Sequence, residues 1–170
     1  MAIYHHKESD LQIRLVRYLR TNYPAFARLL EHPKNEGCGG SAQDRKRQAI
    51  SKAEGVQAGV ADLIWHIPST YHVIDGIPQE EPYTYFSLAL ELKTKVGKQS
   101  AEQKLFQRYF EAAGGLYVLV RSFEDGVKVI DEYAANIPEL VYSRITQLYE
   151  DIYQEQVNAA RAELDRIINK

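Results

Sequence analysis

Cysteine, methionine and tryptophan are scarce in this sequence, with one residue of each among 170. A single cysteine, Cys38, excludes an internal disulfide framework and is typical of a reducing compartment. The sequence also lacks an apolar run long enough for a signal peptide near its start or for a membrane-spanning helix elsewhere. We therefore expect a soluble, cytoplasmic protein that has no membrane partner.

A large excess of one charge is also missing, since 21 basic and 23 acidic residues give a formal net charge of -2. This balance excludes a polybasic, histone-like protein and gives by itself no sign of a nucleic-acid partner. The charges are nevertheless segregated along the chain. Basic residues are concentrated in segments 34–52 and 93–104, whereas acids outnumber bases in residues 121–170.

The pattern of apolar residues predicts an α/β domain with a small mixed sheet. Helices are expected at residues 8–21, 41–53, 100–113 and 122–133, and strands at 61–67, 83–93 and 116–120. The last of these strands is an uninterrupted apolar run, which is typical of a buried central strand.

The segment after Pro138 contains no glycine or further proline and carries an apolar stripe at helical spacing. It predicts a long C-terminal helix that either packs on its own domain or pairs with a second subunit. We accordingly divide the chain into a domain at residues 1–136 and a helical extension at 137–170, which is a candidate dimerisation element.

The strongest chemical signal is Glu91-Leu92-Lys93 in the second predicted strand. Side chains alternate along a strand, so Glu91 and Lys93 share one face. Burying a carboxylate and an ammonium in an apolar strand is costly unless they are paired or hold an ion. The alternative is a solvent-facing pair at the edge of the sheet.

Asp62 lies at the start of the preceding predicted strand. If the two strands are antiparallel neighbours, Asp62 lies near Glu91, and two carboxylates meet a lysine at one rim of the sheet. Carboxylate oxygens suit Mg²⁺, which lowers the pKa of a bound water, while a lysine can orient that water. The alternative for Asp62 taken alone is an exposed aspartate at a strand start or in a turn.

Asp62 followed by Glu91-x-Lys93 resembles the PD-(D/E)XK nuclease signature, and more narrowly the chain resembles a VRR-NUC (virus-type replication-repair nuclease) domain. Six segments within residues 8–133 carry this resemblance in the family's order: Glu8-x-x-x-Gln12, Pro33-Lys34-Asn35-Glu36-Gly37, Gly55-x-x-x-Gly59-Val60-Ala61-Asp62-Leu63, Leu90-Glu91-Leu92-Lys93-Thr94, Gly97-Lys98-x-Ser100-x-x-Gln103 and Gly114-Gly115-x-Tyr117-x-x-Val120. One departure is Ala61, where the family usually has a proline that contributes no ligand.

The resemblance implies a restriction-endonuclease-like core, a small mixed sheet flanked by helices, with the long C-terminal helix added. It implies a DNA endonuclease that depends on Mg²⁺ or Mn²⁺, and a homodimer that selects branched, flap or four-way-junction DNA in replication, repair or recombination. Two alternatives stay open. One is a catalytically inactive nucleic-acid-binding protein with the same fold, and the other is an interaction protein whose charges are structural.

The resemblance also assigns roles to individual residues. Asp62, Glu91, the backbone carbonyl of Leu92 and Glu8 would hold the metal, and Lys93 would position the attacking water. Gln103 matches a catalytic glutamine of the motif. Glu8 can equally be an acid favoured by the helix dipole, and Gln103 can close a capping box with the residue three positions before it.

Basic and polar side chains near these motifs are the predicted contacts to DNA phosphates. They are Lys34, Asn35, Arg45, Lys46, Arg47, Lys95, Lys98 and Lys104. For residues 45–52 the alternative is a solvated helix face.

Overall fold

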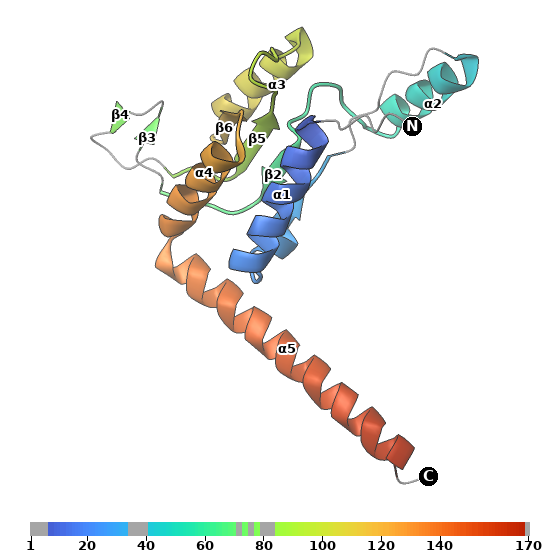
Figure 1. Ribbon diagram of the computed structural model, residues 1–170, viewed down its shortest axis with the longest axis vertical. Helices are drawn as coiled ribbons and strands as arrows, with labels where there is room; N and C mark the ends of the chain where they lie inside the picture. The colour runs from blue at the N-terminus through green and yellow to red at the C-terminus, as the bar shows by residue number, and fades with distance from the viewer. Residues whose placement is uncertain (1–6, 34–40, 71–72, 75–76, 79–83, 169–170) are drawn as a thin grey trace.

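The computed structural model describes residues 7–33, 41–70, 73–74, 77–78 and 84–168. Five α-helices, one 3-10 helix and six strands are found in this part of the chain (Figure 1). In chain order they are α1 (Lys7–Asn22), η1 (Ala27–Leu29), β1 (Leu30–Glu31), α2 (Ala42–Ala53), β2 (Leu63–Trp65), β3 (Val73–Ile74), β4 (Ile77–Pro78), β5 (Leu88–Leu92), α3 (Ala101–Ala112), β6 (Leu116–Val120), α4 (Phe123–Ala135) and α5 (Glu139–Ile168).

Four of these strands form a mixed sheet in the order β1-β2-β5-β6. Strand β2 is antiparallel to both of its neighbours, and Leu63 lies opposite Leu90 of β5. Strands β5 and β6 are parallel, and Leu92 lies opposite Val120. The predicted antiparallel pairing of the first two long strands is therefore confirmed, although both strands are shorter than expected. The connection between them contains the hairpin β3–β4.

Alternation along the strands gives the sheet two different faces. The leucines of β5 join the main core under α1 and α4, which lie side by side on that face (Figure 1). Ala89 and Tyr117 point to the opposite face, where Phe106 and Phe110 of α3 pack against them. Because Glu91 is two residues beyond Ala89, its side chain also points to the α3 face.

Hydrogen bonds that are partly or fully buried fix the helices on the main core. The hydroxyls of Tyr18 and Tyr23 donate to the Asp131 carboxylate over 2.8 and 2.7 Å, which ties α1 and the segment after it to α4. The hydroxyl of Tyr133, fully buried in α4, donates to the backbone oxygen of Ile67 over 2.7 Å. These bonds satisfy polar groups that would be costly to bury alone.

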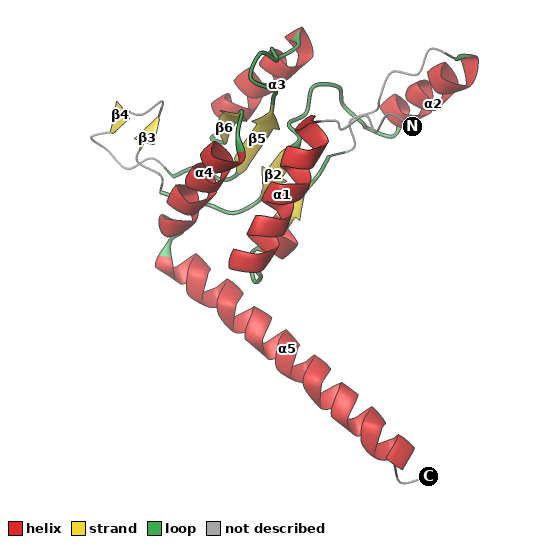
Figure 2. Cartoon of the chain, in the orientation of Figure 1, coloured by secondary structure: helices red, strands yellow, loops and turns green. Residues whose placement is uncertain are grey.

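Helix α5 begins against the main core and then leaves it (Figure 2). Val141 and Ile145 pack on the core, and the ring of Tyr142 lies 5.0 Å from that of Phe26. None of the residues of α5 is buried, although the structure describes the whole helix. The predicted long helix is confirmed, and most of its apolar stripe faces solvent. Among the described helices, none is both long and apolar enough to cross a lipid bilayer.

The position predicted for residues 116–120 is wrong, because β6 is an edge strand and β5 lies inside the sheet. Helices pack on both faces of β6 and leave only Leu119 exposed, so an apolar strand is favoured even though one edge has no neighbour in the described sheet. An uninterrupted apolar run indicates that both faces of a strand are covered, and it does not indicate how many strands pair with it. The two-residue strand β1 was also missed, because so short a segment carries no period.

Two glycines with positive φ allow a prediction about the turn before β2. A side chain on Gly59 (φ +82°) would overlap the backbone of Glu102 and come within 2.7 Å of the Gln103 nitrogen, whereas one on Gly55 (φ +96°) would meet nothing within 4 Å. Gly55→Ala should cost about 1–2 kcal/mol of unfolding free energy through backbone strain alone. Gly59→Ala should cost a further ~1–3 kcal/mol, because α3 must move away. Urea unfolding of both variants measures the difference, and equal losses would contradict the close packing.

A candidate active site at the end of strand β5

Two charged residues at the end of β5, Glu91 within the strand and Lys93 directly after it, lie in the interior of the protein. The side chain of Glu91 is fully buried and Lys93 is only 9% exposed. The Lys93 ammonium lies 2.6 Å from Glu91 Oε1, so the two charges form a buried ion pair. A solvent-facing pair at a sheet edge, the alternative for this motif, is therefore wrong.

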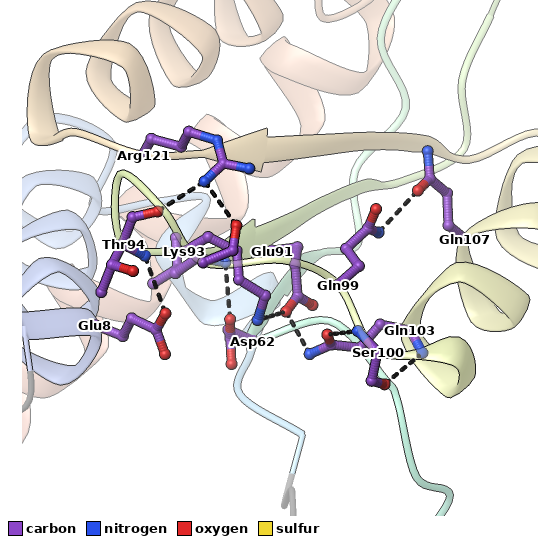
Figure 3. A network of polar contacts seen from close by, with 12 residues as sticks. Glu8, Asp62, Glu91, Lys93, Thr94, Gln99, Ser100, Gln103, Gln107 and Arg121 are labelled. Atoms are coloured by element: carbon purple, nitrogen blue, oxygen red, sulfur yellow. Dashed lines mark hydrogen bonds and ion pairs between the residues drawn. The ribbon is translucent and has the colours of Figure 1, made fainter.

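Asp62 reaches the same end of β5 from the turn that precedes β2. Its Oδ2 accepts the backbone N–H of Leu92 over 2.8 Å, which holds the half-buried carboxylate against the strand end (Figure 3). The Nδ1 atom of His32 lies 2.7 Å from the backbone oxygen of Asp62 and supports the turn from the other side. The prediction that Asp62 and Glu91 lie at the same end of the sheet is therefore confirmed.

Two further side chains hold the Glu91 carboxylate. The side-chain amide of Gln103 donates to Oε1, and the Tyr117 hydroxyl donates to Oε2 over 2.9 Å. Gln103 also completes the capping box of α3. Its Oε1 accepts the Ser100 N–H over 2.9 Å, and its own N–H donates to Ser100 Oγ over 3.2 Å. Gln103 can therefore cap α3 and contact Glu91 at once, because one amide has both a donor and an acceptor. The capping box is confirmed, and the catalytic role stays a prediction.

Burial dominates the electrostatics of the two carboxylates. It raises the pKa of Asp62 and the pKa of Glu91, because desolvation disfavours the charged form. The Leu92 N–H and the charge of Lys93 oppose the rise at Asp62, and the Lys93 ammonium opposes it at Glu91. Repulsion between the two carboxylates raises the pKa of Glu91 further. The single positive charge of Lys93 therefore does not balance the two carboxylates.

Glu8, in the first turn of α1, stands beside this pair rather than inside it. Its Oε1 accepts the Thr94 N–H over 3.0 Å, and its charge contributes to raising the pKa of Asp62 (Figure 3). Within the described part of the chain, no three His, Cys, Asp or Glu side chains are close enough together to enclose a metal ion. The donor set around Asp62 and Glu91 consists of oxygens with excess negative charge, so its chemistry fits a hard divalent cation.

Arg121 was not predicted from the sequence and holds the loop that follows Lys93. Its Nη1 lies 2.7 Å from the Thr94 oxygen, 2.9 Å from the Gly97 oxygen and 3.4 Å from the Lys95 oxygen (Figure 3). The parallel register explains this position, because Arg121 follows directly on the pair Leu92–Val120. Sequence reasoning also gave no role to Tyr117, although it belongs to a quoted motif, or to His32.

The predicted DNA contacts are divided between two regions. Lys95 and Lys98 lie exposed in the loop after Lys93, and Lys104 is exposed on α3. Lys46 is exposed on α2, which stands apart from the sheet in Figure 1. Arg45 and Arg47 belong to the same helix, but their side chains lie outside the described part. Lys34 and Asn35 are outside the described residues altogether.

A comparison with solved structures places this geometry in a known fold. The chain is similar to a structure described as a VRR_NUC domain protein, with a TM-score of 0.56 and 18% sequence identity, over 74% of this chain and 86% of that chain. No protein-family model and no curated protein matches the sequence. At this identity the likeness establishes the fold, so the predicted restriction-endonuclease-like core with its small mixed sheet is confirmed.

The contacts of Arg121 lead to a prediction about the loop at residues 94–98. Arg121→Ala removes a charged donor from the Thr94 and Gly97 carbonyls. A hydrogen bond from a charged group contributes about 1.5–3 kcal/mol to stability, and an exposed loop is expected at the low end of that range. Amide hydrogen exchange at Gly97, whose N–H donates to the Thr94 oxygen over 3.1 Å, should accelerate on the order of tenfold. Arg108→Ala, which removes an exposed arginine of α3, is the control. Unchanged exchange in Arg121→Ala would show that the loop is held by other contacts.

Proposed function

We propose that this chain is a metal-dependent DNA endonuclease that hydrolyses phosphodiester bonds. The observation that supports this most directly is the cluster of Asp62, Glu91 and Lys93 at the buried end of β5. It occurs in a chain with the fold of a VRR_NUC domain protein. The two carboxylates carry more negative charge than Lys93 balances, and a divalent cation would supply the missing positive charge.

In this proposal Asp62, Glu91 and the backbone carbonyl of Leu92 hold Mg²⁺ or Mn²⁺, and Glu8 completes the set from α1. A bound cation lowers the pKa of its water and stabilises negative charge on the phosphate. The protein fixes the ligands in advance. Leu92 N–H holds one oxygen of Asp62, while the amide of Gln103 and the hydroxyl of Tyr117 hold the two oxygens of Glu91.

Lys93 has two roles in the proposed reaction. Its ammonium balances part of the charge on Glu91, from which it lies 2.6 Å away. The same group, 9% exposed at the rim of the site, positions the attacking water and stabilises the charge that develops on the phosphate. Lys95 and Lys98, exposed in the following loop, would bind neighbouring phosphates.

We further propose that the enzyme acts on branched, flap or four-way-junction DNA as a homodimer formed through α5. The helix exposes large apolar side chains along its length, including Leu148 (59%), Ile152 (43%), Leu164 (55%) and Ile167 (63%). An apolar stripe of this length is typical of a helix that pairs with another helix. Two sites on one dimer would match the two strands of a branched substrate.

Cleavage assays test the enzymatic proposal. Wild type should cut duplex, flap or four-way-junction DNA with Mg²⁺ or Mn²⁺ and stop in EDTA. Asp62→Ala and Lys93→Ala should lose about 10²-fold or more in rate, because each removes a group that acts on the reacting atoms. Glu150→Gln, an exposed acid on α5, is the matched control and should cut at the wild-type rate.

Thermal unfolding separates metal binding from catalysis. Mn²⁺ should raise the Tm of wild type and leave that of Asp62→Asn unchanged, since a ligand stabilises only the state that binds it. Full activity in Asp62→Ala or Lys93→Ala would contradict the assigned site. A wild type that binds DNA but cuts none of these substrates with either metal would instead be an inactive nucleic-acid-binding protein with the nuclease fold.

Sedimentation tests the dimer. Leu164→Glu together with Ile167→Glu places two charges on the exposed stripe and away from the core contacts of Val141 and Ile145. The variant should sediment as a monomer at concentrations at which wild type is a dimer, because charges buried in an apolar interface are strongly destabilising. Glu163→Gln, also on the outer part of α5, should stay dimeric. A dimeric double variant would exclude this part of α5 from the interface.

A further inference from the structure

A groove runs along the flank of α1, away from the carboxylate pair. Its volume is about 580 Å³, and its lining includes Gln12, Val16, Arg17, Arg20, Thr21 and His32. All but His32 belong to α1 and recur at helical spacing, so they form one face of that helix. His32 forms the opposite wall, just after β1.

This groove is connected to the candidate active site through His32. One nitrogen of its ring lies 2.7 Å from the backbone oxygen of Asp62, and the ring also lines the groove. Helix α1 forms a second link between the groove and the site, because Glu8 in its first turn accepts a hydrogen bond from the loop after Lys93. A ligand in the groove would therefore contact the same histidine that supports the turn of Asp62.

The charge of the lining is positive. Arg17 and Arg20 are exposed, and neither forms an ion pair with another described residue. Among the described residues, the lining contains no aspartate or glutamate, although Glu8 and Asp10 belong to the same helix. Ser9, Gln12 and Thr21 add neutral hydrogen-bonding groups. Two guanidinium groups among neutral donors suit the oxygens of phosphate groups.

We propose that this α1 groove binds the sugar-phosphate backbone of the DNA strand that leaves the active site, with Arg17 and Arg20 on consecutive phosphates. This inference rests on the proposed function, which places the scissile phosphate at Asp62 and Glu91. Arg17 is nine residues along α1 from Glu8, about 13.5 Å at 1.5 Å per residue. At about 3.4 Å of helix axis per nucleotide, the contacts fall roughly four to five nucleotides from the cut.

The alternative for Arg20 is a purely structural role, since a cation in the last turn of a helix interacts favourably with its dipole. That role would affect the stability of α1 and leave DNA binding intact. It also gives no reason for Arg17, one turn earlier, or for the lack of acids among the described lining residues. The two accounts therefore differ in what a binding experiment measures.

The deciding experiment is the salt dependence of DNA binding, measured by fluorescence anisotropy in EDTA so that nothing is cut. Each arginine that contacts a phosphate adds about 0.9 to the slope of log Kd against log salt. Arg17→Ala and Arg20→Ala should each lower the slope by about 1, and the double variant by about 2. Arg144→Ala, which removes an exposed arginine from α5, is the matched control and should keep the wild-type slope.

Neutral methylphosphonate linkages locate the contact. Scanned along one strand, they should weaken wild-type binding at one or two adjacent positions, and the same linkages should have no further effect on the double variant. Arg20→Lys should restore most of the slope, since it keeps the charge. A double variant with the wild-type slope and the wild-type methylphosphonate pattern would overturn the proposal.

The outcomes keep the two proposals apart. If wild type cuts DNA and the arginine variants bind with an unchanged slope, the groove proposal fails and the nuclease stands. If the slope falls as expected while no metal supports cleavage, the groove stands and the enzymatic proposal fails. A wild type that neither binds DNA in EDTA nor cuts it with either metal would overturn both.

Discussion

Everything at the end of the sheet depends on placing one carboxylate, Glu91, inside the protein. An isolated buried carboxylate would protonate, because the interior solvates its charge poorly. Lys93, Gln103 and Tyr117 together replace the water that Glu91 has lost, with one ion pair and two hydrogen bonds from neutral groups. The Asp62 carboxylate beside Glu91 leaves this end of the sheet with more negative charge than Lys93 balances, and this excess distinguishes the cluster from an ordinary buried ion pair.

The topology explains how residues far apart in the sequence reach this carboxylate. Because β2 runs antiparallel to β5, the turn before β2 lies at the end of β5, which places Asp62 on the Leu92 N–H. Because β6 runs parallel to β5, Arg121 leaves the sheet beside the loop that follows Lys93. The residues of the site therefore lie at or next to the ends of the strands, and the packed core holds these ends at fixed distances from one another. The site is a property of the register of the strands as much as of its residues.

Much of this arrangement could be predicted from the sequence. Spacing placed Glu91 and Lys93 on one face, and the antiparallel pairing placed Asp62 beside them. The edge position of β6 was missed because covered faces make a strand apolar whether or not both edges are paired. Arg121 and His32 were missed for another reason: each acts through backbone carbonyls, and a contact to backbone leaves no pattern of residue types in the sequence. The exposure of most of α5 could not be predicted either, since an amphipathic period indicates an apolar face and not what covers it.

The shared amide of Gln103 restricts which residue that position can hold. A helix start accepts glutamate as readily as glutamine at this place, because either side chain can reach back to the backbone N–H of Ser100. Glu91 removes that freedom, since a second carboxylate would face the first with no proton to donate. Helix formation alone would therefore accept either glutamate or glutamine at position 103, whereas the carboxylate of Glu91 favours glutamine. The same contact means that fraying of the first turn of α3 would release Glu91 from one of its three partners, so local order in a surface helix is coupled to the hydrogen bonding of a buried acid.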